Sequence, residues 1–166
     1  MACVLYMLDP DAYFQRIAEI FKGKLAGKNV IYITTNKTYG AMAELFNAEH
    51  VDMGTIFFID CISQQINRKA ASAPNCVVLE GPKNVTQMGI AISKAMASVQ
   101  GEKVLFLDSL STMLIYNDPG VVGRFSNFIM NKARMAGVDG CIMALSTDMD
   151  KKVVGFAQAF ADKVEK

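Results

Sequence analysis

Metal-ligand and disulfide signals are missing from this sequence. It has one histidine, His50, and four cysteines that show no CxxC spacing: Cys3, Cys61, Cys76 and Cys141. A structural zinc site needs four clustered ligands, and a disulfide framework is typical of short secreted chains with paired cysteines. Three of the cysteines lie in or beside strongly apolar runs, where a free thiol packs like a small hydrophobic side chain. We therefore expect buried, reduced thiols, and nothing in the sequence indicates a cofactor.

Long hydrophobic runs and a leader segment are missing as well. No stretch approaches the ~20 apolar residues that are needed to cross a bilayer. The N-terminal run MACVLYMLD is short and has no basic residues before it, unlike a secretory signal. These features predict a cytoplasmic protein with no membrane contact.

An excess of charge of one sign is the third absence. The 17 basic and 16 acidic residues leave a formal charge of +1, and the chain has no tryptophan and no interleaving of basic with aromatic residues. The phosphate contribution to nucleic-acid binding would therefore be small. The composition argues against a DNA or RNA partner.

Apolar residues, by contrast, are plentiful. The chain has 166 residues, of which 52% are hydrophobic, and this is the length of one ordinary domain. No linker or low-complexity segment divides it, so we expect a single α/β domain over residues 1–166. Six short apolar runs fit strands that are buried on both faces of a sheet. They are Ala2–Leu8, Val30–Ile33, Thr55–Ile59, Cys76–Leu79, Val104–Leu107 and Cys141–Leu145.

Segments with helical spacing alternate with these runs. Three of them cover residues 14–21, 86–98 and 120–136. Their start signals are Asp9-Pro10-Asp11, either Asn84 or Thr86, and Asp118-Pro119. The polar stretch Gln64–Asn75 is expected to be a surface loop. Alternating strands and helices predict a three-layer αβα sandwich around a mainly parallel sheet.

Polar side chains follow the predicted strands at the edge of the sheet where ligands bind in open parallel α/β folds. They are Thr35, Asn36, Lys37, Asp60, Asp108, Ser109 and Ser146. Together these side chains could form a crevice for a small molecule or a cation. Asp, Ser and Thr are also favoured helix N-caps, so a purely structural role for each of them stays open.

The strand that ends at Asp108 is the most informative. Four apolar residues, Val104–Leu107, precede Asp108, as in a Walker B strand, where the carboxylate holds the Mg²⁺ of a nucleotide. If the chain binds a metal ion, Asp108 is the candidate ligand.

The longer segment LFLDSLSTMLIYN, residues 105–117, resembles the Walker B region of the RecA superfamily, and most closely that of its KaiC-like members. Other segments resemble the family in the same order: NVIYITT its second strand, TIFFIDCIS its third, VDGCIMALS the strand after Walker B, and residues 159–164 the segment before a further strand. The resemblance covers nearly the whole chain and is closest to small archaeal RecA-like domains of unassigned function. It implies a RecA-like sheet, with the chain ending where the family continues that sheet.

The turn after the first strand departs from the family. The family has G-x-x-x-x-G-K-[ST] there, a loop whose backbone N–H groups, lysine and hydroxyl hold phosphate and Mg²⁺. This chain has Asp9-Pro10-Asp11-Ala12-Tyr13, with no Gly, Lys, Ser or Thr. Asp9 and Asp11 would face the phosphates, and like charges at close range cost a few kcal/mol at an effective dielectric of about 20.

A second departure follows the second strand. The resemblance implies acidic residues there to activate the attacking water, but this chain has Thr35-Asn36-Lys37-Thr38. The prediction is a degenerate P-loop and no ATP hydrolysis.

The favoured function is therefore a catalytically inactive RecA-like domain that acts as an interaction or regulatory module. The expected partner is another protein or a second copy, since RecA-like domains commonly assemble through their sides. The apolar stretch Met113–Tyr116 and the eleven methionines would supply an adaptable surface, unless they simply fill the core.

Two alternatives stay open. The first is a sensor that binds a small ligand or nucleotide in the polar crevice at the strand ends, with Lys37 facing a phosphate or carboxylate. The second is an enzyme, which the sequence supports poorly. His50 lies away from the strand ends, and Cys61, which follows Asp60, has no basic neighbour to activate its thiol.

Overall fold

The computed structural model describes residues 1–147 and 151–166. Its centre is a seven-stranded sheet in the order β4-β3-β2-β5-β6-β1-β7, in which every strand pair is parallel. The strands are β1 Cys3–Leu8, β2 Asn29–Thr34, β3 Ile56–Asp60, β4 Cys76–Val78, β5 Lys103–Asp108, β6 Asp139–Leu145 and β7 Lys163–Glu165. Six of them coincide with the six apolar runs, which confirms the prediction of buried parallel strands.

The seventh strand, β7, corrects the expectation that the chain ends before the sheet continues. It pairs with residues 4–6 of β1 at the edge of the sheet. An edge strand has one side open to solvent, and here Lys163 and Glu165 flank Val164, which is itself exposed. No apolar run marks such a strand in the sequence.

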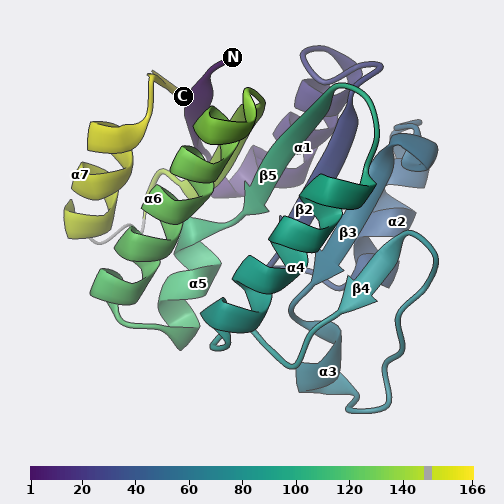
Figure 1. Ribbon diagram of the computed structural model, residues 1–166. Coiled ribbons are helices and arrows are strands. Elements are labelled where there is room, and N and C mark those ends of the chain that lie inside the picture. Colours follow the sequence, from purple (N-terminus) through teal and green to yellow (C-terminus); the bar gives the residue numbers. More distant parts are fainter. Residues whose placement is uncertain (148–150) are drawn as a thin grey trace.

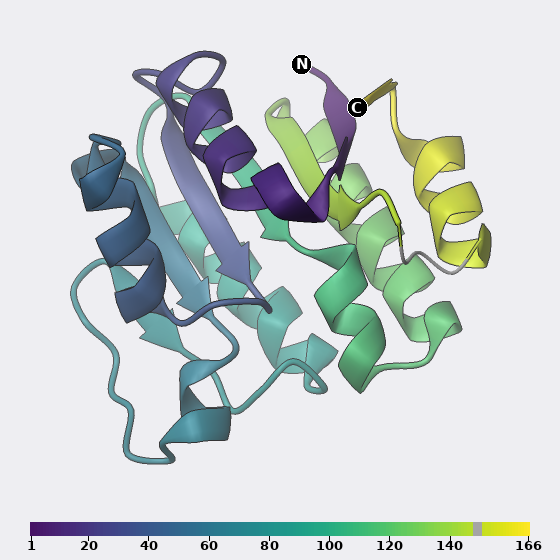
Figure 2. The same ribbon diagram turned by 180° about the vertical axis from the view of Figure 1, so that it is seen from behind.

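Helices cover both faces of the sheet, as Figures 1 and 2 show from opposite sides. One face carries α1 Tyr13–Lys22 and α2 Tyr39–Ala48, and the other carries α4 Val85–Ser98, α5 Leu110–Tyr116, α6 Pro119–Ala136 and α7 Lys151–Phe160. The remaining short elements are α3 Ser63–Ile66 and the 3-10 turns η1 Pro10–Ala12 and η2 Met53–Thr55. This is the predicted α/β architecture in three layers.

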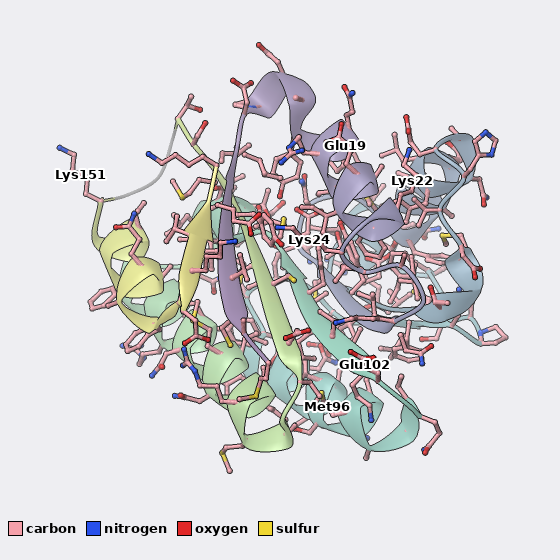
Figure 3. The ribbon with its side chains drawn as sticks, turned by 90° about the horizontal axis from the view of Figure 1, so that it is seen from above. Glu19, Lys22, Lys24, Met96, Glu102 and Lys151 are labelled. Carbon is pink, nitrogen blue, oxygen red and sulfur yellow. The ribbon has the colours of Figure 1, made fainter. Side chains whose placement is uncertain are left out.

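The sheet separates two hydrophobic cores because successive strand residues point to opposite faces. In β5, Leu105 and Leu107 pack beneath α4, α5 and α6, whereas Phe106 packs beneath α1 and α2. Figure 3 shows the layers from above, with Glu19 and Lys22 of α1 on one side of the sheet and Met96 of α4 on the other.

Local signals set the helix boundaries. Of the two predicted caps for α4, Asn84 is the cap, and its side chain accepts a hydrogen bond from the backbone N–H of Gln87 at 3.0 Å. Helix α6 begins at Pro119 and ends at Ala136, and it is capped by Gly137, whose φ of 67° is left-handed. The segment Gln64–Asn75 is not entirely a loop, because α3 extends into it. Among the described residues, no helix has the length and apolar character that a bilayer crossing requires.

Candidate functional site

Asp108, at the end of β5, lies at the centre of a buried hydrogen-bond cluster. The hydroxyl of Tyr13 donates to its Oδ1 at 2.5 Å, and the hydroxyl of Tyr32 donates to its Oδ2 at 2.6 Å. The Nδ2 amide of Asn36 donates a longer bond to Oδ1, at 3.3 Å. The Asp108 side chain is completely buried. Both carboxylate oxygens therefore have donors from within the chain.

Three different elements bring these donors to Asp108. Tyr13 is the first residue of α1, directly after the turn that follows β1. Tyr32 lies in β2 opposite Phe106 of β5, and the two rings stack with centroids 4.9 Å apart. Asn36 follows the end of β2, which pairs with the end of β5. The carboxylate thus connects the first helix of the fold to two central strands.

Burial dominates the electrostatics of this cluster. It raises the pKa of Asp108, while the bonds from Tyr13, Tyr32 and Asn36 oppose the rise because they stabilise the ionised form. Burial, together with the nearby Asp108 carboxyl, holds the pKa values of Tyr13 and Tyr32 well above their usual value. Both phenols therefore stay protonated at neutral pH and act as donors.

The residues at Asp108 do not fit the Mg²⁺ that a Walker B strand implies. This ion prefers an octahedral set of oxygen ligands, but both Asp108 oxygens already accept phenol protons. Within residues 1–147 and 151–166, no group of three or more His, Cys, Asp or Glu residues could hold a metal ion.

The turn after β1 offers little to a phosphate. Asp9, Pro10 and Asp11 are all exposed. The carboxylate of Asp9 accepts the backbone N–H of Asp11 at 2.8 Å, and Pro10 has no N–H to donate. The backbone donors that would face a phosphate are reduced in number, and two carboxylates stand beside them.

Thr35 and Ser109 hold the end of β5 against α5. The hydroxyl of Thr35 lies 3.2 Å from the carbonyls of Asp108 and Ser109 and 2.8 Å from the hydroxyl of Thr112. Ser109 is the N-cap of α5 and accepts the N–H of Thr112. The Asp108–Ser109 peptide bond is cis. These contacts correspond to the helix-capping and structural roles that the sequence left open for Thr35 and Ser109.

Asp60 also has a capping role in this structure. Its buried carboxylate accepts backbone N–H bonds from Tyr39, Ile62 and Ser63, each at 2.8 Å. It lies beside Thr34 on one side of β2, and Asp108 lies on the other side. The two carboxylates therefore serve separate hydrogen-bond clusters.

Lys37 and Ser146 lie at the margin of the cluster. The Lys37 ammonium is 4.8 Å from the centroid of the Phe14 ring. The backbone carbonyl of Lys37 accepts a hydrogen bond from the hydroxyl of Thr34. Ser146 is exposed, and its N–H donates to Leu8. Of the seven residues proposed for a crevice, the hydrogen bonds join Asp108, Ser109, Thr35 and Asn36.

Sequence reasoning missed the two tyrosines that complete the cluster. In the sequence, Tyr13 belongs to the altered turn and Tyr32 to a strand, and neither has a neighbour that marks it as part of a site. The available signal was the period of two along β2, which puts Tyr32 on the face where the neighbouring strand presents Phe106 and Asp108.

The expected apolar surface at Met113–Tyr116 is only partly present. Met113 is buried in α5, and Ile115 is 73% exposed. Five of the ten methionines with a stated burial are buried in the two cores, including Met42, Met88 and Met143, whereas Met135 on α6 is 91% exposed.

Comparison with known proteins places the chain in a family. A family model described as a family of unknown function, DUF7504, matches residues 9–165. The chain belongs to this family. No curated protein gives a significant match to this DUF7504 protein.

Two solved structures share the fold of this DUF7504 protein. The KaiC-like protein PH0186 from the hyperthermophilic archaeon Pyrococcus horikoshii is 13% identical with a TM-score of 0.70, and the match covers 98% of this chain and 70% of that protein. The uncharacterised protein PH0321 from Pyrococcus horikoshii, solved in complex with an unknown peptide, is 14% identical with a TM-score of 0.68, covering 98% and 76%. These likenesses support a RecA/KaiC-like fold.

Proposed function

We propose that this DUF7504 protein is a catalytically inactive RecA-like domain with a degenerate P-loop, and that it acts by binding another protein. One observation carries the proposal. The carboxylate that would hold Mg²⁺, Asp108, is buried and bonded to the hydroxyl groups of Tyr13 and Tyr32. A metal-bound nucleotide would have to displace Tyr13, and it would meet Asp9 and Asp11 in place of a phosphate-binding lysine.

Two observations support a protein or peptide as the partner. PH0321, which shares this fold, was solved in complex with an unknown peptide. This chain also exposes large apolar side chains on α4 and α6, including Ile90 and Phe128. Exposed apolar groups that gather on one face of a soluble domain are typical of interaction surfaces.

Thermal melting with ATP and Mg²⁺ tests the inactive part of the proposal. A ligand present at 100 times its dissociation constant stabilises a protein by about 2.7 kcal/mol, which moves the melting temperature by several degrees. We expect no shift at millimolar ATP and no phosphate release. A RecA-like ATPase with an intact P-loop is the positive control. A clear shift, or hydrolysis above background, would overturn the proposal.

The second candidate is a small-ligand sensor at the strand ends. Lys37 favours it, because this half-buried residue supplies a cation just after β2, where it could face a phosphate or carboxylate. The hydrogen bonding disfavours it: in the part of the chain that the structure describes, every buried side-chain N or O has a partner. A melting screen with nucleotides, metabolites and divalent ions decides, since a reproducible shift with one of them would favour the sensor.

A further inference from the structure

A groove runs between α4 and α6 on the outer face of the molecule. Two adjoining cavities of about 440 and 580 Å³ form it, and both are lined by Ser93 of α4 and Phe128 of α6. Figure 1 shows the two helices on the same face of the sheet. The groove lies far from the turn after β1 in the chain and uses none of the residues that surround Asp108.

Apolar side chains line this groove at helical spacing. On α6, Phe128 and Met135 are seven residues apart and are 39% and 91% exposed. On α4, Ile90 is 53% exposed and Ala97 lies seven residues further on. Such a surface offers anchor positions to a helix that lies along it. Methionine adapts its shape to a partner, which suits a docking surface.

A helical glycine keeps the groove open. Gly89 lies in the middle of α4 and lines the smaller cavity. A Cβ atom at this position would stand 3.6 Å from the Phe128 ring, in ordinary contact. A larger side chain at Gly89 would therefore occupy the space above Phe128 without a clash with the backbone.

The charge around the groove has one sign. Helices α4 and α6 together carry Lys94, Arg124, Lys132 and Arg134 and contain no Asp or Glu. Arg134 pairs with Asp162, whereas Lys94 and Lys132 line the groove, and the Lys132 ammonium lies 5.8 Å from the Phe128 ring centroid. A partner that fills the groove meets cations at its margins.

These observations select one occupant. A second copy that packs by two-fold symmetry, groove against groove, would bring Lys94 and Lys132 against the same lysines, and like charges disfavour that pairing. An acidic amphipathic partner would cover the exposed apolar side chains and would also pair with Lys94 and Lys132. The outer face of α4 from Val85 to Ala97 is about 18 Å long at 1.5 Å per residue, which matches about three turns of a partner helix.

We infer that the α4–α6 groove binds an amphipathic helix of another protein, with apolar side chains on one face and Asp or Glu along its edges. This inference rests on the proposed function, because it assigns the surface and the partner class of the interaction module. Apolar anchors supply the contact area, and the acidic edges select the partner and its orientation.

Two synthetic helical peptides of the same length test the inference. Both carry Leu and Phe at positions i, i+3, i+4 and i+7, one with Glu and the other with Lys at the flanking positions. Fluorescence anisotropy is measured with the full chain at low and moderate salt. We expect the Glu peptide to bind about tenfold or more tightly than the Lys peptide, with a difference that shrinks as salt screens the charges. Equal binding of the two peptides, or none, would overturn the inference.

Two variants connect the binding to the groove. Gly89→Leu fills the space above Phe128 and should abolish binding of the Glu peptide, while its melting temperature shows that it is folded. The double variant Lys94→Glu and Lys132→Glu should reverse the preference in favour of the Lys peptide. Unchanged binding by a folded Gly89→Leu variant would mean that the peptide binds elsewhere, and the inference would be wrong.

A capture experiment separates this inference from the proposed function. Wild-type chain and Gly89→Leu are used to retain proteins from a lysate of the native host. If both retain the same partner equally, the groove is not the site, although an interaction module remains. If ATP with Mg²⁺ stabilises the chain, the proposed function fails whatever the peptides do. Loss of the partner with Gly89→Leu, together with the preference for the Glu peptide, supports both the proposed function and the groove as the binding site.

Discussion

At the scale of single residues, Asp108 shows how the neighbouring side chains decide what a carboxylate at a strand end can bind. Four apolar residues and an aspartate predict a metal ligand, and the structure keeps that aspartate at the end of β5. The environment of Asp108 differs from that of a metal-binding Walker B aspartate, because Tyr13 begins α1 where the family resemblance implies a phosphate-binding turn. The phenol supplies a proton where Mg²⁺ would supply charge, so the Asp108 carboxylate is held by hydrogen bonds from within the chain.

Replacing Tyr13 with Phe tests how much the hydrogen bond from Tyr13 to Asp108 contributes to stability. Tyr13→Phe removes one donor and leaves a buried carboxylate less satisfied, so we expect a loss of about 1.5–3 kcal/mol in unfolding free energy at pH 8. Chemical denaturation measures the loss. Tyr39→Phe is the matched control, because the Tyr39 hydroxyl donates to the neutral Oδ1 of Asn75 at 3.1 Å. Its cost should be about 1 kcal/mol.

The two tyrosine variants should differ in their pH dependence. Burial raises the pKa of Asp108 above its usual value of 3.8, so this group reduces stability as the pH rises from 3.8 through its pKa in the folded protein. Tyr13 opposes that rise, and the variant without its hydroxyl has a still higher Asp108 pKa. The cost of Tyr13→Phe should therefore grow from pH 4 to pH 8, while that of Tyr39→Phe stays constant. A cost for Tyr13→Phe that does not change with pH would contradict the idea that the Tyr13 hydroxyl stabilises ionised Asp108.

At the scale of elements, the sequence predicted strands better than helices. The strands are continuous apolar runs because both faces of the sheet are covered, so β1 to β6 are evident without any alignment. Helix α2 was not predicted, since only Met42 and Phe46 of its ten residues are buried. Only part of the candidate site was predictable from the sequence. Asp108 ends β5, and Thr35 and Asn36 follow β2, but the approach of Tyr13 depends on how α1 packs against these two strands.

Two glycines in the outer helices should respond in opposite directions to alanine. Gly89→Ala should stabilise the protein by about 0.5–1 kcal/mol, because glycine in a helix interior is unfavourable and its Cβ atom would make ordinary contact with Phe128. Gly137→Ala should destabilise it by about 1 kcal/mol, because φ is 67° at this helix end and alanine resists the left-handed region. Thermal denaturation of both variants gives the comparison. A gain from Gly137→Ala would show that α6 ends differently.

At the scale of the whole molecule, the four buried cysteines report on both cores. Cys3 and Cys61 belong to the core beneath α4 to α7, and Cys76 and Cys141 belong to the core beneath α1 and α2. Burial raises the pKa values of Cys76 and Cys141 to about 12 and also raises those of Cys3 and Cys61. All four thiols are therefore protonated and unreactive in the folded state.

Thiol labelling of single-cysteine variants tests whether residues 1–166 fold as one unit. The two cores share strands β1 to β6, so opening one face exposes the strands that the other face needs. We expect Cys61 and Cys141 to become reactive at the same denaturant concentration and with the same opening free energy, as in two-state unfolding. Far-ultraviolet circular dichroism should follow the same transition and controls for damage by the cysteine replacements. If Cys141 reacts at a concentration that leaves Cys61 protected, the α1–α2 layer opens separately, and Tyr13 could then leave Asp108 without global unfolding.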